Sequence, residues 1–213
     1  IVAFHNVCKH RCLKLVDQAK NVGKMISCPY HAWTFDLDGK LRASPFFGGT
    51  DSDQPPDFNA DDHCLESVRV KVWHDWIFIN INDNAPPFEE YAAPLINILK
   101  NINFEKITPV GTLNFEKIST NWKFLIENYI EPYHVPFVHS KTTKQPLQDH
   151  YTIVDGRCLG SGVNLNEENT AEDKLSVSSK YLSLFPNFII GTYCLDQRYL
   201  GVHLNQALGP NCS

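Results

Sequence analysis

The sequence predicts an α+β protein in two parts, an all-β N-terminal domain over residues 1–85 and a mixed domain over residues 86–213. Three observations predict this division. Short apolar runs alternate with turn residues up to about residue 85, a helical stripe follows Pro86-Pro87, and strand-like runs return after residue 150. A chain of 213 residues is long enough for two small domains, each with its own core.

Two antiparallel pairs are predicted in the N-terminal part. Asp38-Gly39 separates two short apolar runs and is a hairpin signal. Val68, Val70 and Val72 alternate with charged residues, and His74-Asp75 turns the chain into the apolar run 76–81. Between these pairs, residues 46–62 combine glycines and prolines with acidic residues, so we expect a long exposed loop.

The C-terminal part is predicted to open with helices. Apolar residues recur at helical spacing between Phe88 and Ile102, which predicts one amphipathic helix. Thr120 is the expected N-cap of a second helix, which Pro132 and Pro136 must break or bend. Strands are then expected at 151–154, 158–162, 181–184, 188–193 and 199–205.

Composition excludes several classes of protein. The formal charge of -5 and the pI near 6.0 arise from intermixed acidic and basic residues, so no basic stripe predicts a nucleic-acid partner. No apolar run approaches the roughly 18 residues that a membrane span requires. We therefore expect a cytoplasmic protein with neither a nucleic-acid nor a membrane partner.

The seven cysteines and the two chain ends carry further expectations. An odd cysteine count argues against a closed disulfide framework and leaves thiols free for metal binding or packing. The chain opens on Ile1, its only methionine is Met25, and it stops in turn-forming residues at 209–213. We therefore expect a fragment that is truncated at both ends.

The first candidate site is a pair of short cysteine–histidine motifs. Cys8 precedes His10, and Cys28 precedes His31, so two loops would each supply one sulfur and one nitrogen ligand. A Rieske [2Fe–2S] cluster requires two thiolates on one iron and two imidazoles on the other. A structural zinc site uses the same four ligands, so the ligand set alone leaves both possibilities open.

The second candidate site is the pair His134 and His139, five residues apart. Five residues of straight helix turn a side chain through roughly 140°, so the two rings converge only if the helix breaks between them. Pro136 is the expected break. Two histidines and a carboxylate are the ligands of non-haem Fe(II) oxygenases, although histidines near a helix end also occur without any metal.

The two segments together resemble a known family. Cys8-Lys9-His10-Arg11 with Cys28-Pro29-Tyr30-His31-Ala32-Trp33 resembles the Rieske motif of ring-hydroxylating oxygenases, and the segment from Asn121-Trp122-Lys123 to His139 resembles their catalytic motif. Cys12 and Ala32 stand where the family usually has glycine. The chain is thus similar to the α subunit of a Rieske non-haem iron oxygenase, including the relatives that act on choline and carnitine.

The resemblance implies a fold and a set of ligands. It implies a Rieske domain over 1–85 and a helix-grip catalytic domain of the START type over 86–213. By this similarity Cys8 and Cys28 hold one cluster iron, His10 and His31 the other, and Trp33 packs beside the loop. The mononuclear Fe(II) would be bound by His134 and His139, with the third ligand beyond residue 213.

The resemblance also implies a mechanism and partners. Electrons from NAD(P)H would arrive through a separate ferredoxin or flavin reductase, and O₂ would oxidise a small-molecule substrate. Glu131, together with Asn128, is the implied catalytic residue, and Glu131 would bridge His134 to His31 of another chain. Transfer between chains implies a ring-shaped oligomer, most often a homotrimer.

Two other functions stay open from the sequence alone. One is a Rieske electron carrier without oxygenase activity, and the other is a zinc-stabilised binding module. The substrate class is also open, because the aromatic residues around 181–199 suit either ring stacking or an aromatic cage for a quaternary amine.

Overall fold

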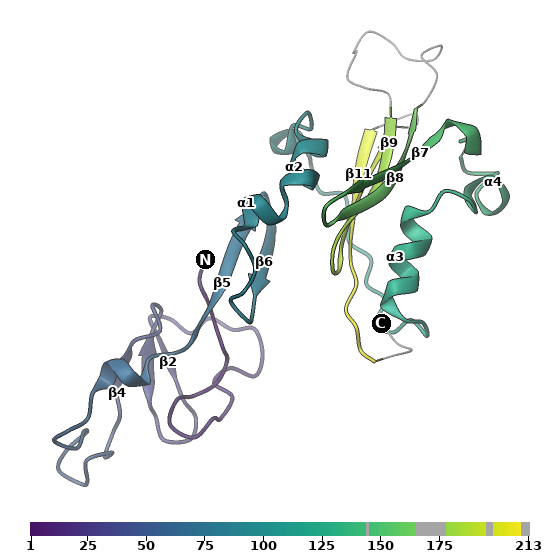
Figure 1. Ribbon diagram of the computed structural model, residues 1–213. Coiled ribbons are helices and arrows are strands. Elements are labelled where there is room, and N and C mark those ends of the chain that lie inside the picture. Colours follow the sequence, from purple (N-terminus) through teal and green to yellow (C-terminus); the bar gives the residue numbers. More distant parts are fainter. Residues whose placement is uncertain (144, 165–177, 195–197, 210–213) are drawn as a thin grey trace. The chain divides into compact units, whose positions relative to one another are not determined.

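The protein is described here by a computed structural model that covers residues 1–143, 145–164, 178–194 and 198–209. The chain divides into two compact units, Ile1–Ala85 and Pro86–Ser213. Figure 1 shows a strand-rich first unit and a second unit with one large sheet. The described residues thus form mostly sheet with few helices. No helix among them is both long and apolar enough to cross a bilayer.

The first unit contains two small antiparallel sheets. One has the order β1-β5-β6 and the other the order β2-β3-β4. Their strands are β1 (Ala3–Phe4), β2 (Met25–Ser27), β3 (Thr34–Asp36), β4 (Leu41–Ala43), β5 (Ser67–Trp73) and β6 (Trp76–Asn80). Both predicted antiparallel pairs are confirmed, and the loop over 46–62 is largely exposed and ends in the short 3₁₀ helix η1 (Ala60–His63).

Asp36 organises the hairpin between β3 and β4. Its carboxylate accepts the backbone N–H groups of Asp38 and Lys40, each at 2.9 Å, and the Arg42 Nε–H at 2.7 Å. Gly39 occupies the turn with φ +82°, a left-handed conformation that favours glycine. The Asp-Gly signal therefore works through both residues: the carboxylate caps the turn, and the glycine reverses the chain.

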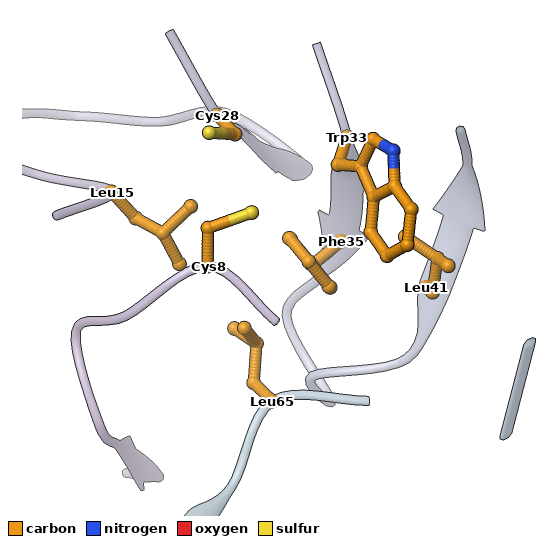
Figure 2. Close-up of a cluster of buried hydrophobic side chains, with 7 residues drawn as sticks. All are labelled: Cys8, Leu15, Cys28, Trp33, Phe35, Leu41 and Leu65. Atoms are coloured by element: carbon orange, nitrogen blue, oxygen red, sulfur yellow. The ribbon is translucent and has the colours of Figure 1, made fainter. Parts of the chain in front are cut away.

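The core of the first unit lies beside the two cysteine loops. Cys8 and Cys28 belong to the same buried cluster as Trp33 and Phe35 (Figure 2). The other buried members of this cluster are Leu15, Leu41 and Leu65. The loops that carry the candidate ligands are therefore anchored in the apolar core.

The second unit opens with two short helices rather than the single helix predicted over 88–102. They are α1 (Phe88–Tyr91) and α2 (Ala93–Leu99), separated at Ala92. Pro94 lies in the first turn of α2, where its missing N–H cannot continue the hydrogen bonding of α1. Leu95 and Leu99 of the predicted stripe are nevertheless buried.

Five antiparallel strands in the order β11-β10-β9-β8-β7 form the sheet of the second unit. They are β7 (His150–Asp155), β8 (Cys158–Asn164), β9 (Ser178–Leu184), β10 (Phe188–Cys194) and β11 (Arg198–Leu204), and each predicted strand is confirmed. The remaining elements are η2 (Phe104–Lys106), α3 (Trp122–Ile130), α4 (Val135–Val138) and η3 (Leu147–Asp149).

Helix α3 packs on one face of this sheet (Figure 1). Ser161, Tyr181, Gly191 and Gly201 are cross-strand partners in one row, so their side-chain directions share a face. The Tyr129 hydroxyl of α3 lies against Gly191, which assigns this row to the face that α3 covers. We call this the α3 face. The opposite face carries buried aliphatic residues, among them Leu182, Leu184 and Ile190.

We predict that Gly191→Ala destabilises the second unit. A Cβ atom at residue 191 would collide with the Tyr129 hydroxyl and crowd the Tyr193 ring, so the Tyr129 side chain must leave its position between α3 and the sheet. The free energy of unfolding should fall by about 1–3 kcal/mol. Gly111→Ala is the control, since nothing surrounds that position, and its effect should stay within about 0.5 kcal/mol. Equal effects of the two substitutions in chemical denaturation would contradict this packing.

Candidate metal centres

Cys8 and Cys28 each begin a tight loop of the same construction. The Cys8 N–H donates to the carbonyl of Leu13 at 2.8 Å, and the Cys28 N–H donates to the carbonyl of Trp33, also at 2.8 Å. In both loops the hydrogen bond spans five residues and holds the cysteine at the base. The two segments, unrelated in their intervening residues, therefore fold into matching ligand loops.

The residue before the end of each loop adopts a left-handed conformation. Cys12 has φ 57° and Ala32 has φ 55°, and these are the two positions where the resemblance predicts glycine. Their N–H groups donate to the carbonyls of Cys8 at 2.9 Å and Cys28 at 3.1 Å. The loops thus keep the backbone that glycine favours, although both residues carry a Cβ atom that this conformation strains.

The four predicted cluster ligands pair by chemical type. Cys8 and Cys28 are both buried, and the Cys28 thiol lies close enough to contribute to a raised pKa at Cys8. The rings of His10 and His31 lie beside each other, with centroids 4.8 Å apart. A Rieske cluster needs its ligands grouped by type in this way, because one iron takes two thiolates and the other takes two imidazoles.

The protonation chemistry of these residues fits such a cluster. Burial raises the pKa of Cys8, and the adjacent Cys28 adds to the effect, so two thiolates here require a neighbouring positive charge. Burial, followed by the influence of His31, lowers the pKa of His10. Metal ligation requires neutral imidazole and deprotonated thiol. His10 is therefore prepared for metal binding, and iron would supply the positive charge that a Cys8 thiolate needs.

Aromatic rings hold the ligand His10 in place. Its ring stacks on Trp33 with centroids 4.7 Å apart and planes only 8° apart, and the edges of Phe47, Phe58 and His63 meet the Trp33 ring. Trp33 was expected beside the loop, but the contribution of the other three rings was missed. His63 and Phe58 stack at 4.6 Å, and no spacing in the sequence links them to the ligand motifs.

A recess of about 480 Å³ lies over the histidine pair. Its walls include Tyr30, Phe46 and Phe47, and both ligand imidazoles line it. Tyr30 and Phe46 are largely exposed, as is His31. The imidazole side of the candidate cluster is therefore accessible, whereas both thiols are buried, although Cys28 also borders the recess.

In the second candidate site, the helix breaks earlier than predicted. Helix α3 ends at Ile130, Glu131 is extended, and Pro136 lies in the first turn of the separate helix α4 rather than at the break. Pro132 causes the break, because a residue that precedes proline is disfavoured in the helical conformation. His134 and His139 consequently flank the single turn of α4 instead of sharing one bent helix.

The break brings the two histidines together. The centroids of the His134 and His139 rings lie 5.1 Å apart. Glu131 forms a hydrogen bond with the Nδ1 atom of His134, and its other carboxylate oxygen accepts the Tyr133 N–H at 2.6 Å. A carboxylate on one ring nitrogen orients the other nitrogen toward a metal. Glu131 makes this contact from the position after α3, not across a helical turn as predicted.

Asn128 is not drawn into this group. Its side chain lies exposed on α3 and hydrogen-bonds to none of the described residues. Within the ranges that the structure describes, no three His, Cys, Asp or Glu side chains gather as ligands of one ion. His134 and His139 are thus described as a pair, and the implied third ligand stays a prediction.

A group of tyrosines, which sequence spacing did not reveal, joins α3 to the sheet. The hydroxyls of Tyr129 and Tyr193 lie 2.7 Å apart, and Tyr129 also packs against Tyr181 and His203. Burial raises the pKa of Tyr129, Tyr181 and Tyr193, so the three phenols stay neutral. The α3 face is therefore lined with uncharged phenol rings.

Two family models match the chain. The Rieske [2Fe-2S] domain matches residues 1–53, and the catalytic domain of the ring hydroxylating alpha subunit matches residues 104–196. These ranges contain all four candidate cluster ligands and both histidines of the second site.

Curated relatives and solved structures agree with these matches. The chain is 35% identical over 147 residues to the glycine betaine monooxygenase oxygenase subunit of Pseudomonas aeruginosa PAO1, covering 68% of this chain and 32% of that protein. It is 31% identical to the large oxygenase component of salicylate 5-hydroxylase from Ralstonia sp, covering 66% and 35%. The chain therefore spans about a third of the length of these curated relatives.

The fold also matches a solved structure. The naphthalene 1,2-dioxygenase from Rhodococcus sp., determined with indole bound, superposes with a TM-score of 0.75 at 18% sequence identity. The match covers 98% of this chain and 57% of that one. At this level of identity the likeness concerns the fold.

We predict that Glu131 makes stability depend on pH in the acid range. Burial acts to raise the pKa of Glu131, but the hydrogen bonds from His134 and the Tyr133 N–H outweigh it and lower the pKa overall. A carboxyl with a depressed pKa stabilises the fold above its unfolded pKa of about 4.3, and this contribution is lost as the pH falls through the folded pKa. The free energy of unfolding of the metal-free protein should therefore fall less on acidification in Glu131→Gln than in the unmodified protein.

The exposed Glu127 gives the control for this measurement. Glu127→Gln should keep the acid dependence of the unmodified protein, because this side chain is exposed on α3. If Glu131→Gln and the unmodified protein lose stability equally between neutral pH and pH about 3, the contact between Glu131 and His134 does not contribute to the pH dependence of stability.

Proposed function

Because the chain belongs to the family of Rieske oxygenase subunits, we propose that it serves as the oxygenase component of an enzyme that oxidises a small organic substrate with O₂. The observation that carries this proposal is the presence of two distinct ligand groups in one chain. Paired thiols and imidazoles lie in the first unit, and paired imidazoles with a bonded carboxylate lie in the second.

The residues of the first unit are assigned to the cluster. Cys8 and Cys28, which are both buried, would hold one iron, and His10 and His31, which both line the recess, would hold the other. The hydrogen bonds that close the two loops fix the cysteines, and Trp33 fixes the plane of His10. When bound, the cluster supplies single electrons and the mononuclear iron supplies the activation of O₂.

The residues of the second unit are assigned to the mononuclear iron. His134 and His139 would bind it, while Glu131 holds the His134 ring by its Nδ1 atom. Glu131 is 40% exposed in its side chain, so a further hydrogen bond from outside the chain can reach it. We assign Glu131 as the link to His31 of a neighbouring copy, which is itself exposed, and this assignment requires a ring-shaped oligomer such as a homotrimer.

Electron supply and location follow from this assignment. A separate ferredoxin or flavin reductase would deliver electrons from NAD(P)H to the accessible imidazole side of the cluster. We keep the cytoplasm as the proposed location, because NAD(P)H is supplied there. Asn128 is kept as a candidate second-site residue on α3, close in sequence to Glu131 and His134.

The fold of the second unit supports a substrate site on the α3 face. A sheet covered on one face by the nine-residue helix α3 is consistent with part of a helix-grip fold of the START type, in which the site lies between helix and sheet. Neutral tyrosine rings on this face suit either an aromatic compound or a quaternary amine. We propose hydroxylation, demethylation or cleavage of such a substrate as the reaction.

The rival functions account for less of the chain. An electron carrier would use only the first unit and leaves the contact between Glu131 and His134 without a role. A zinc-stabilised module would use the same four residues, but it leaves the match of residues 1–53 to the Rieske [2Fe-2S] domain without an explanation.

We predict a [2Fe–2S] cluster with mixed ligation in the first unit. The anaerobically isolated protein should show labile sulfide, and His10→Cys should lower its reduction potential by roughly 200 mV or more, because thiolate stabilises the oxidised state. His74→Asn is the control, since that residue lies at the turn between β5 and β6 with a positive φ that asparagine tolerates. Stoichiometric zinc without sulfide would contradict the assignment.

We predict different defects for the two residues of the second site. Glu131→Gln should leave cluster spectra and iron content close to normal but slow the oxidation of the reduced cluster during turnover. His134→Ala should instead remove the mononuclear iron, because it deletes a ligand rather than a positioning group. Rapid-mixing spectroscopy and metal analysis separate the two defects, and an unchanged rate in Glu131→Gln rules out the linking role.

A further inference from the structure

Three residues on or beside the α3 face have buried polar atoms without a hydrogen-bond partner of normal geometry among the described residues. Ser161 is only 2% exposed, and its Oγ atom has no partner. Both ring nitrogens of His150 and the Oγ1 atom of Thr143 are also buried and form no hydrogen bond of normal geometry, although the backbone of Gln145 lies near the His150 ring. Buried polar atoms in folded proteins are nearly always paired, so three such residues in one region point to a ligand.

Two of these residues, Ser161 and His150, are neighbours on the sheet. Ser161 is paired in register with Thr152, and His150 lies two residues before Thr152 on the same strand, which makes His150 and Ser161 diagonal neighbours on the α3 face. On the other side, Ser161 is paired with Tyr181. The polar group thus lies next to the tyrosines of this face.

Thr143 connects the polar group to the candidate iron site. Its N–H donates to the carbonyl of His139 at 2.9 Å. Two residues later, the side-chain oxygen of the buried Gln145 accepts a hydrogen bond from the Tyr181 hydroxyl at 2.9 Å. This bond joins the segment to β9, the strand that pairs with β8 at Ser161. The segment that carries Thr143 thus connects the histidine pair to the tyrosines of the α3 face.

The polar atoms favour a hydrogen-bond acceptor. Ser161 and Thr143 each offer an O–H donor, and His150 offers one N–H in its neutral form, which burial favours by lowering its pKa. A carboxylate accepts several hydrogen bonds from converging donors, and bonds to a charged acceptor are the stronger ones. A neutral alcohol or an ammonium group satisfies fewer of these donors.

We propose that Ser161, His150 and Thr143 bind the carboxylate of a small organic acid, which is the substrate of the proposed oxygenase. The inference rests on the proposed function only in calling this ligand the substrate. The rest of the acid lies along Tyr181 and Tyr129, where aromatic rings accept either an aromatic ring or a quaternary ammonium group.

The test uses matched probes that differ in the carboxylate. Isothermal titration of the metal-loaded full chain compares glycine betaine with choline, which share a trimethylammonium group, and benzoate with benzyl alcohol, which share a ring. In at least one pair we expect the acid to bind more tightly. Ser161→Ala should weaken that acid roughly 10- to 100-fold and its alcohol less than about threefold.

Two further variants guard against misfolding and unspecific effects. Thr143→Val, which keeps the shape of the side chain, should weaken the acid in the same selective way. Ser183→Ala removes another buried hydroxyl on the same face and should leave both affinities unchanged. Binding is measured independently of turnover, so its outcome does not depend on electron delivery.

Three results would overturn the carboxylate site. These are binding of neither acid, equal affinity for acid and alcohol in both pairs, and equal weakening of acid and alcohol by Ser161→Ala, which indicates that the polar atoms bind water. Selective acid binding by a protein that fails to consume O₂ when reduced would instead reject the proposed function and leave the carboxylate site intact.

Discussion

The hydrogen bond from each cysteine N–H to the carbonyl five residues later is the constraint on which the first centre depends. It closes both candidate ligand loops on themselves, so each cysteine belongs to the buried core while the histidine of the same loop lines the recess. Buried thiols and accessible imidazoles follow directly from this closure. The separation of ligands by chemical type, which distinguishes the centre from a single-ion site, is a property of the loop backbone.

The second centre depends on a different constraint, the termination of α3. Pro132 forces Glu131 out of the helix, and the chain then makes one separate turn between His134 and His139. An uninterrupted helix would direct these two rings away from each other. The same break frees the Glu131 carboxylate to accept two hydrogen bonds from the residues that follow it.

Sequence patterns predicted most of the fold because they reflect local physics. The strands of the second unit and the Asp-Gly hairpin depend on alternation and turn chemistry, and both were located. The helix over 88–102 was predicted too long, because its apolar spacing continues across Pro94 while the hydrogen bonding does not. For the same reason the break near His134 was assigned to Pro136 rather than to Pro132.

In the candidate sites too, some residues could be predicted from the sequence and others only from the structure. Ligands with short spacing, such as Cys8 and His10, are visible in the sequence, whereas their supporting rings come from distant segments. His63 reaches Trp33, and Ser161 lies beside Tyr181, only through tertiary packing and strand register. No periodicity encodes such neighbours, so they required the folded structure.

The pairing of β1 with β5 sets an order of assembly for the first unit. Ala3 pairs with Val68, so this sheet cannot close until the chain has been made beyond the hairpin, whereas each ligand loop closes over five residues. Contacts between neighbours in sequence form faster than contacts that close a long loop. During synthesis the metal-binding loops can therefore form before the sheet beneath them is complete, which gives the nascent chain a period when its thiols are shaped but not yet enclosed.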